Sequence, residues 1–101
     1  MEQNIQIKDE DQQRRILLQG NLDATLSPDL EAVLDQQRLQ SETLLIIDLE
    51  SVSSVTADGV RVLLNAFINK AQYAGGLVVA NPNDEVKQLM ITVGLEALLS
   101  E

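Results

Sequence analysis

The sequence contains no cysteine and no histidine, and only Phe67 and Tyr73 are aromatic. Without these residues the protein lacks disulfides, thiolate nucleophiles, the usual zinc ligands and imidazole acid–base catalysis. A serine nucleophile would lack its ordinary base, and the chain carries no nucleotide-binding glycine motif. Two aromatic side chains are also too few for stacking nucleic-acid bases. The sequence therefore predicts a protein that is not an enzyme and uses no cofactor.

Basic residues are scarce as well: seven Lys and Arg stand against sixteen Asp and Glu, which gives a formal net charge of −9. The sequence has no run of Lys and Arg that could follow a phosphate backbone. Neither nucleic acids nor anionic membranes are therefore expected as partners. No apolar stretch approaches the roughly 20 residues of a membrane span, and the N-terminus does not read as a secretion signal. We expect one cytoplasmic domain, residues 1–101, that does not insert into a membrane.

The strongest structural signal lies in the middle of the chain. Residues 44–48 begin with an unbroken apolar block, which is typical of a strand buried on both faces. The polar segment 51–59 follows and is expected to be a turn that carries the functional surface. A long helix comes next, and Gly75 and Gly76 are expected to end it. Its expected buried stripe, at intervals of three and four, is Val60, Leu63, Leu64, Phe67, Ala71 and Ala74.

The N-terminal third predicts a hairpin and a helix. Residues 4–8 and 15–22 have strand character and are expected to pair antiparallel, with Gly20 marking a bulge or a close backbone approach. Ser27, followed by proline, predicts the cap of a first helix that ends near residues 39–41.

The C-terminal third predicts one more strand and helix. Residues 77–80 form an apolar strand, which a right-handed crossover places parallel to residues 44–48. Asn83 is the expected cap of a third helix ending at Gly94, and residues 95–101 form either a last strand or a single turn. The fold class is α/β, with a small mixed sheet of about four to five strands packed with three to four helices.

Short motifs follow one another along essentially the whole chain. They are Gly20-Asn21-Leu22-Asp23, Leu30, Leu34, Ile46-Ile47-Asp48-Leu49, Val52, Val55, Gly59-Val60-Arg61-Val62-Leu63-Leu64, Gly75-Gly76, Asn81-Pro82-Asn83, Val86, Leu89 and Gly94-Leu95. Each motif alone is common. Their order and spacing together resemble the STAS family, the sulphate-transporter and anti-sigma-factor-antagonist domains.

This resemblance implies regulation by partner switching. Single-domain bacterial members of the family bind an anti-sigma factor of the serine-kinase ATPase fold and thereby free a sigma factor. The kinase shuts such a protein off by phosphorylating the second serine of an Asp-Ser-Ser-Gly motif, and a phosphatase regulator reverses the modification. The resemblance, together with the side of the long helix expected to face solvent, suggests these partner-binding residues: Asp23, Ser53, Ser54, Thr56, Ala57, Asp58, Gly59, Arg61, Val62, Asn65 and Tyr73.

Asp58 departs from the family motif, because the four motif positions here read Thr56-Ala57-Asp58-Gly59. A carboxylate has no hydroxyl for a kinase to modify, and it carries one negative charge against about −1.5 to −2 for phosphoserine. Asp58 is either a permanent mimic of the modified state or a helix cap and dipole partner. As a mimic it either locks the protein away from a kinase-type partner, or the partner accepts the carboxylate and regulation lies elsewhere. Thr56 is an alternative phosphate acceptor, although hydroxyls in turns usually bond their own backbone.

Two further interpretations remain open. The resemblance also implies an accessory subunit of a membrane transporter, for example a lipid-transport ATPase, or a phosphorylation-independent scaffold, neither of which needs a phosphoserine. Asp23, Asp48 and Asp58 suggest an acidic magnesium site like that of receiver domains. The paired acidic residues and the lysine of a receiver are absent from the expected places, so no metal site is predicted.

Overall fold

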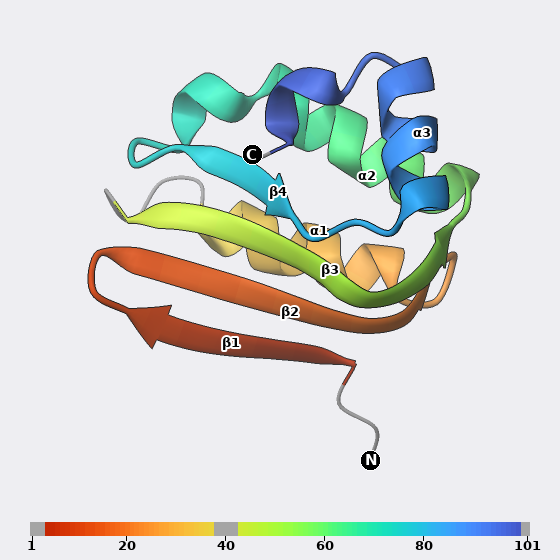
Figure 1. Ribbon diagram of the computed structural model, residues 1–101. Helices are drawn as coiled ribbons and strands as arrows, with labels where there is room; N and C mark the ends of the chain where they lie inside the picture. The colour runs from red at the N-terminus through yellow and green to blue at the C-terminus, as the bar shows by residue number, and fades with distance from the viewer. Residues whose placement is uncertain (1–3, 38–42, 100–101) are drawn as a thin grey trace.

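The computed structural model describes residues 4–37 and 43–99. Figure 1 shows the order of the elements. They are β1 (Ile5–Glu10), β2 (Gln13–Leu22), α1 (Ser27–Gln37), β3 (Leu44–Val55), α2 (Ala57–Ile68), the 3₁₀ turn η1 (Lys70–Gln72), β4 (Leu77–Ala80), α3 (Asp84–Thr92) and the 3₁₀ turn η2 (Glu96–Leu98). The predicted end of the first helix at residues 39–41 lies outside the described residues.

The four strands form one mixed sheet in the order β1-β2-β3-β4. β1 and β2 pair antiparallel, which confirms the predicted hairpin, whereas β2–β3 and β3–β4 pair parallel. The register of β2 against β3 shifts between Leu17 and Gln19 and again between Gly20 and Leu22. Gly20 itself stays paired with Val52, with a φ of +97° in the left-handed region, and the extra residue at each shift lies on β3. A four-stranded sheet with three α-helices confirms the predicted α/β class.

Both parallel crossovers run in the same direction across the sheet, so right-handed connections place α1 and α2 on the same face. In Figure 1, α1 lies behind β2 and β3. The core between helices and sheet is almost entirely aliphatic. Its fully buried members include Ile16, Leu18, Leu22, Leu30, Ile47, Leu49, Leu63, Val79, Met90, Leu95 and Leu98. None of the helices within residues 4–37 and 43–99 has the length and apolar character needed to span a bilayer.

Strand β3 is longer than predicted. Residues 51–55, expected to belong to a turn, continue the strand as far as Val55. Their serines suggested a turn, but pairing of Gly20 with Val52 and of Leu22 with Val55 keeps this segment extended. Long-range pairing with β2 therefore overrides the local turn propensity, and only Thr56 separates β3 from α2.

The buried face of α2 differs from the predicted stripe. Among the expected residues Leu63 is buried, but Ala71 and Ala74 lie exposed beyond the helix, which ends at Ile68 and not at the glycines. The buried positions are Gly59, Val62, Leu63 and Ala66, again at intervals of three and four. Glycine is buried on this face because α2 approaches the sheet closely there, and a hydrophobicity pattern does not count glycine as a core residue. Since Val62 is 1% and Tyr73 6% exposed, the prediction that they face solvent is wrong.

The third helix and the C-terminal segment agree with the sequence. Asn83 caps α3, since its Oδ1 accepts a hydrogen bond of 2.8 Å from the Val86 N–H. After Gly94, with a φ of +89°, the chain makes the single turn η2. Leu99 then forms an isolated parallel bridge with Val79. The segment thus combines the two predicted alternatives of a turn and a strand.

Ser27 does not cap α1 as predicted; Asp23 instead stabilises the turn that leads into the helix. Asp23 Oδ1 accepts hydrogen bonds from the Thr25 and Leu26 N–H groups at 3.0 and 3.2 Å. Ser27 is fully buried, and its Oγ has no hydrogen-bond partner among the described residues. Burying a hydroxyl without a partner is unfavourable, so Ser27 destabilises the fold.

We expect Ser27→Ala to raise the free energy of unfolding by about 0.5–2 kcal/mol, because it removes the unpaired hydroxyl and improves helix propensity. Asp23→Ala should lower the free energy of unfolding by about 1 kcal/mol, because the turn before α1 loses its side-chain hydrogen bonds. Urea unfolding of both variants measures the two changes. A destabilised Ser27→Ala variant would show that the hydroxyl has a partner after all.

Candidate functional site

The carboxyl ends of the parallel strands β2, β3 and β4 lie at one edge of the sheet, where the chain turns into α1, α2 and α3. This is the edge at which open α/β sheets usually carry their binding sites. The predicted functional segment lies here, between the end of β3 and the first turn of α2. Asp23 follows β2 at the same edge.

Asp58 occupies the first turn of α2 and is exposed. Within the described part of the chain its carboxylate has no hydrogen-bond or ion-pair partner. Thr56, not Asp58, is the N-cap residue. The interpretation of Asp58 as a side-chain cap is therefore wrong, although its charge still lies near the positive end of the helix dipole. An unpartnered carboxylate at a helix start is available to a partner molecule.

The start of α2 is held against the end of β2 through one atom, the carbonyl oxygen of Leu22. The Thr56 N–H donates to it at 3.0 Å and the Thr56 hydroxyl at 3.3 Å, so that hydroxyl makes no capping bond. A Cβ atom at Gly59 would lie 2.7 Å from the same oxygen and 2.8 Å from a Val55 methyl carbon. Only glycine lets α2 approach the sheet this closely, and the contact fixes where Asp58 projects.

Two asparagines support the segment from either side, and sequence reasoning did not assign either to the site. The Ser54 hydroxyl donates to Asn21 Oδ1 at 3.0 Å. Asn83 Nδ2 donates to the Ser53 carbonyl at 3.1 Å and to the Val52 carbonyl at 3.4 Å. Asn21 lies at the carboxyl end of β2 and Asn83 follows β4 at the same edge, and that placement was the available signal. The end of β3 is thus joined to β2 on one side and to the β4–α3 connection on the other.

The structure brings together most of the predicted partner-binding residues. Those exposed around the start of α2 are Ser53, Thr56, Ala57, Asp58, Arg61 and Asn65, while Asp23 and Ser54 are half-buried. Arg61 Nη1 lies 3.8 Å from Glu31 Oε2 on α1, a weak surface pair.

The predicted contact strip along α2 is not available to a partner helix. Val62 and Tyr73 lie between α1 and α2, together with Leu34 and Ala66. The helix that packs on this side of α2 is therefore α1 of the same chain. Gly59 is also buried, so its role is to permit close packing.

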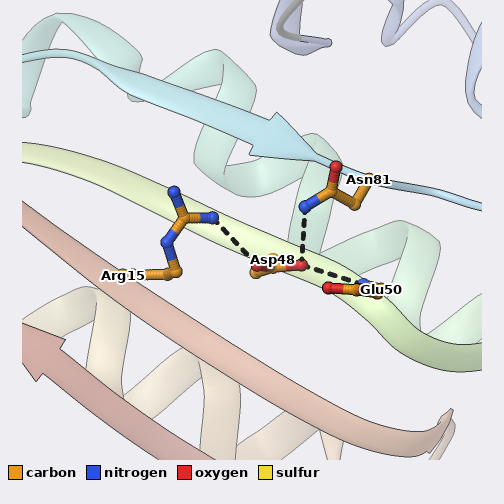
Figure 2. Close-up of polar contacts among 4 residues, drawn as sticks. All are labelled: Arg15, Asp48, Glu50 and Asn81. Atoms are coloured by element: carbon orange, nitrogen blue, oxygen red, sulfur yellow. Dashed lines mark hydrogen bonds and ion pairs between the residues drawn. The ribbon is translucent and has the colours of Figure 1, made fainter.

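Asp48 belongs to a separate polar group on the sheet face opposite the core (Figure 2). Its Oδ2 accepts a hydrogen bond of 2.8 Å from Arg15 Nη1, and its Oδ1 accepts bonds from Asn81 Nδ2 at 3.2 Å and the Glu50 N–H at 2.9 Å. Burial opposes ionisation, but the Glu50, Asn81 and Arg15 donors outweigh it and hold the pKa of Asp48 below its ordinary value.

The acidic magnesium site has no support in this geometry. The Asp48 carboxylate is engaged by Arg15, Asn81 and Glu50 on a different face from Asp58. Within residues 4–37 and 43–99 no group of three or more acidic side chains lies close enough to hold a metal ion.

Exposed polar loops at one edge of a two-layer α/β domain define a class of small binding modules. The chain belongs to the STAS family, because the family model described as "Mlab, STAS domain" matches residues 5–100. A comparison with curated proteins gave no match.

Solved structures share the fold over nearly the whole chain. The anti-sigma factor antagonist SpoIIAA in its unphosphorylated form has a TM-score of 0.79 and 22% identity, over 95% of this chain and 85% of that chain. Bacillus SpoIIAA in the phosphorylated form has a TM-score of 0.75 and 21% identity, over 95% of this chain and 88% of that chain. An anti-sigma factor antagonist from Mycobacterium paratuberculosis has a TM-score of 0.74 and 22% identity, over 94% of this chain and 80% of that chain. At these identities the likeness concerns the fold.

Proposed function

We propose that this protein is a cytoplasmic anti-sigma-factor-antagonist-like STAS protein, which acts by reversible binding to an anti-sigma factor of the serine-kinase ATPase fold. The observation that supports this proposal is the exposed Asp58 carboxylate on the first turn of α2, which has no partner among residues 4–37 and 43–99. It occupies the position where the family resemblance expects a phosphorylated serine. The contact is non-covalent, so the protein needs no catalytic residue or cofactor.

The fixed charge of Asp58 separates this protein from a switch driven by its own phosphorylation. Aspartate carries one negative charge and two acceptor oxygens, whereas phosphoserine carries about −1.5 to −2 and three acceptor oxygens. A partner that binds this site must accept the carboxylate permanently, with a cation or N–H donors opposite it. Control of the interaction then lies in the partner or its phosphatase regulator.

A second candidate function is an accessory subunit of a membrane transporter, or a phosphorylation-independent scaffold. Neither of these functions needs a phosphorylated residue. They are favoured because Asp58 has no hydroxyl and because the Thr56 hydroxyl is already bonded to the Leu22 carbonyl. Affinity capture from the native cell separates the two candidates. Recovery of an ATPase-fold anti-sigma factor supports the first, and recovery of a transporter nucleotide-binding subunit supports the second.

Asp58 substitutions test the contact itself. We expect Asp58→Ala to weaken binding to the captured, purified partner roughly ten- to hundredfold, the usual effect of losing hydrogen bonds to a charged group. Asp58→Ser should also bind more weakly, because serine lacks the negative charge and the second acceptor oxygen of the carboxylate. Both variants should unfold within about 1 kcal/mol of the wild type, because Asp58 is exposed and unpartnered. Isothermal titration calorimetry and urea unfolding measure the two effects.

Equal affinity of all three proteins would contradict a contact at Asp58. Asp29→Ala is the matched control, since Asp29 is an exposed acidic residue in the first turn of another helix, α1, and is not among the predicted partner-binding residues. Intact-mass measurement of the native protein tests Thr56 as an alternative acceptor. We expect no added phosphate there, because the hydroxyl already donates to Leu22.

A further inference from the structure

Asn83 uses both ends of its side-chain amide at once. The oxygen accepts the Val86 N–H at 2.8 Å and so caps α3. The nitrogen donates to the carbonyls of Ser53 and Val52, at 3.1 and 3.4 Å. One side chain therefore joins the start of α3 to the last residues of β3, which lead directly into Thr56 and Asp58.

The end of β3 needs this donor because its neighbour is shorter. β4 pairs with β3 only as far as the Asp48–Ala80 pair, whereas β3 continues to Val55. On its other side β3 remains paired with β2 up to the Leu22–Val55 pair. Beyond Ala80, the side-chain N–H₂ of Asn83 thus takes the place of a strand backbone N–H on the outer edge of β3. Without this donor, the Ser53 carbonyl would be an unpaired acceptor at the strand edge.

We propose that Asn83 is a positioning residue for the Asp58 site: its amide nitrogen holds the end of β3 in place, and through it the first turn of α2. The placement of Asp58 then depends on α3 as well as on β2. The functional meaning of this coupling rests on the proposed function, but the coupling itself is a property of the isolated protein.

Asn83→Asp separates the two roles of the side chain. Aspartate caps a helix as well as asparagine does, so the bond to the Val86 N–H persists. The donor is replaced by a carboxylate oxygen, which repels the Ser53 carbonyl. Asn83→Ser is the uncharged companion, since serine also caps but has no amide nitrogen. Asn69→Asp is the matched control, because it removes an amide donor, to Asn65 O at 3.0 Å, at the opposite end of α2.

Amide hydrogen exchange followed by NMR is the readout. The Thr56 N–H, bonded to Leu22 O at 3.0 Å, and the Val60 N–H, bonded to Thr56 O at 2.9 Å, report on the site. In both Asn83 variants we expect their protection to fall roughly two- to tenfold, the effect of one lost hydrogen bond. The Val86 and Lys87 amides of α3 and the amides of β2 should keep their protection. The Asn69→Asp control should leave Thr56 and Val60 unchanged.

Two results would overturn the proposal. One is unchanged protection of Thr56 and Val60 in both Asn83 variants, and the other is an equal fall at every amide, which is what a purely structural role produces. The exchange experiment needs no partner, so it is independent of the Asp58 binding series. If the exchange changes appear while Asp58→Ala binds like the wild type, the proposed function fails and the coupling stands.

Discussion

Arg15→Met is expected to lower the free energy of unfolding by about 2–4 kcal/mol, because it leaves the Asp48 carboxylate buried without its cation. Asp48 is only 4% exposed, and Arg15 supplies the sole ion pair that it makes within the described residues. We expect a loss near the lower end of the range for removing one partner of a buried ion pair, because Asn81 and the Glu50 N–H still donate to the carboxylate. Methionine keeps the aliphatic stem, so the change isolates the charge. Urea unfolding at neutral pH measures it.

Arg14→Met is the matched control for this prediction. Arg14 precedes Arg15 in the same strand and pairs with Asp9 at the exposed hairpin, where solvent screens the charges. We expect a much smaller loss there. Adding Asp48→Asn to Arg15→Met should recover part of the stability, because the unpaired charge is then removed. A double variant less stable than Arg15→Met would show that the buried charge is not the cause.

The Asp48 contribution also predicts a pH dependence. The pKa of Asp48 is lower in the folded protein than its unfolded value of about 3.9, so the folded state favours the ionised form. The stabilisation is complete above the unfolded pKa and is lost as the pH falls through the folded pKa. The stability difference between wild type and Asp48→Asn should therefore be constant near neutral pH and shrink on acidification below about pH 4.

Gly59→Ala is the second substitution with a large expected effect, a loss of about 1–3 kcal/mol. The added methyl carbon would lie 2.7 Å from the Leu22 carbonyl oxygen, 2.8 Å from Leu22 Cγ and 2.8 Å from Val55 Cγ1. A backbone oxygen cannot rotate away as a flexible side chain can, so α2 must move off the sheet. This strain opposes and exceeds the gain of about 0.5–1 kcal/mol that alanine brings to a helix.

Thermal or urea unfolding of Gly59→Ala, compared with Asp58→Ala, checks this expectation. Asp58 is the preceding residue of the same helical turn but is exposed and unpartnered, so its substitution should have little effect on stability. Displacement of α2 should also weaken partner binding, since the first turn of α2 carries Asp58. A Gly59→Ala variant as stable as the wild type would mean that the helix can shift without loss.

Local sequence signals were sufficient where the relevant contacts are also local. The alternating hairpin strands, the apolar blocks of β3 and β4 and the Asn83 cap of α3 were predicted correctly, because each depends on neighbouring residues. The exposed position of Asp58 at the start of a helix also followed from the motif. These elements, in this order, indicated the STAS fold.

The sequence by itself determined the fold class, the order of the elements and an acidic residue at the helix start, because these depend on residue type and periodicity. Only the tertiary structure decided which face of α2 is buried, how far β3 extends and which side chains hold the Asp58 turn. Packing against α1 buries Val62 and Tyr73, and pairing with β2 turns a serine-rich segment into strand. Contacts of Asn83 and Asn21 with β3 join residues about 30 positions apart, beyond the reach of any local pattern.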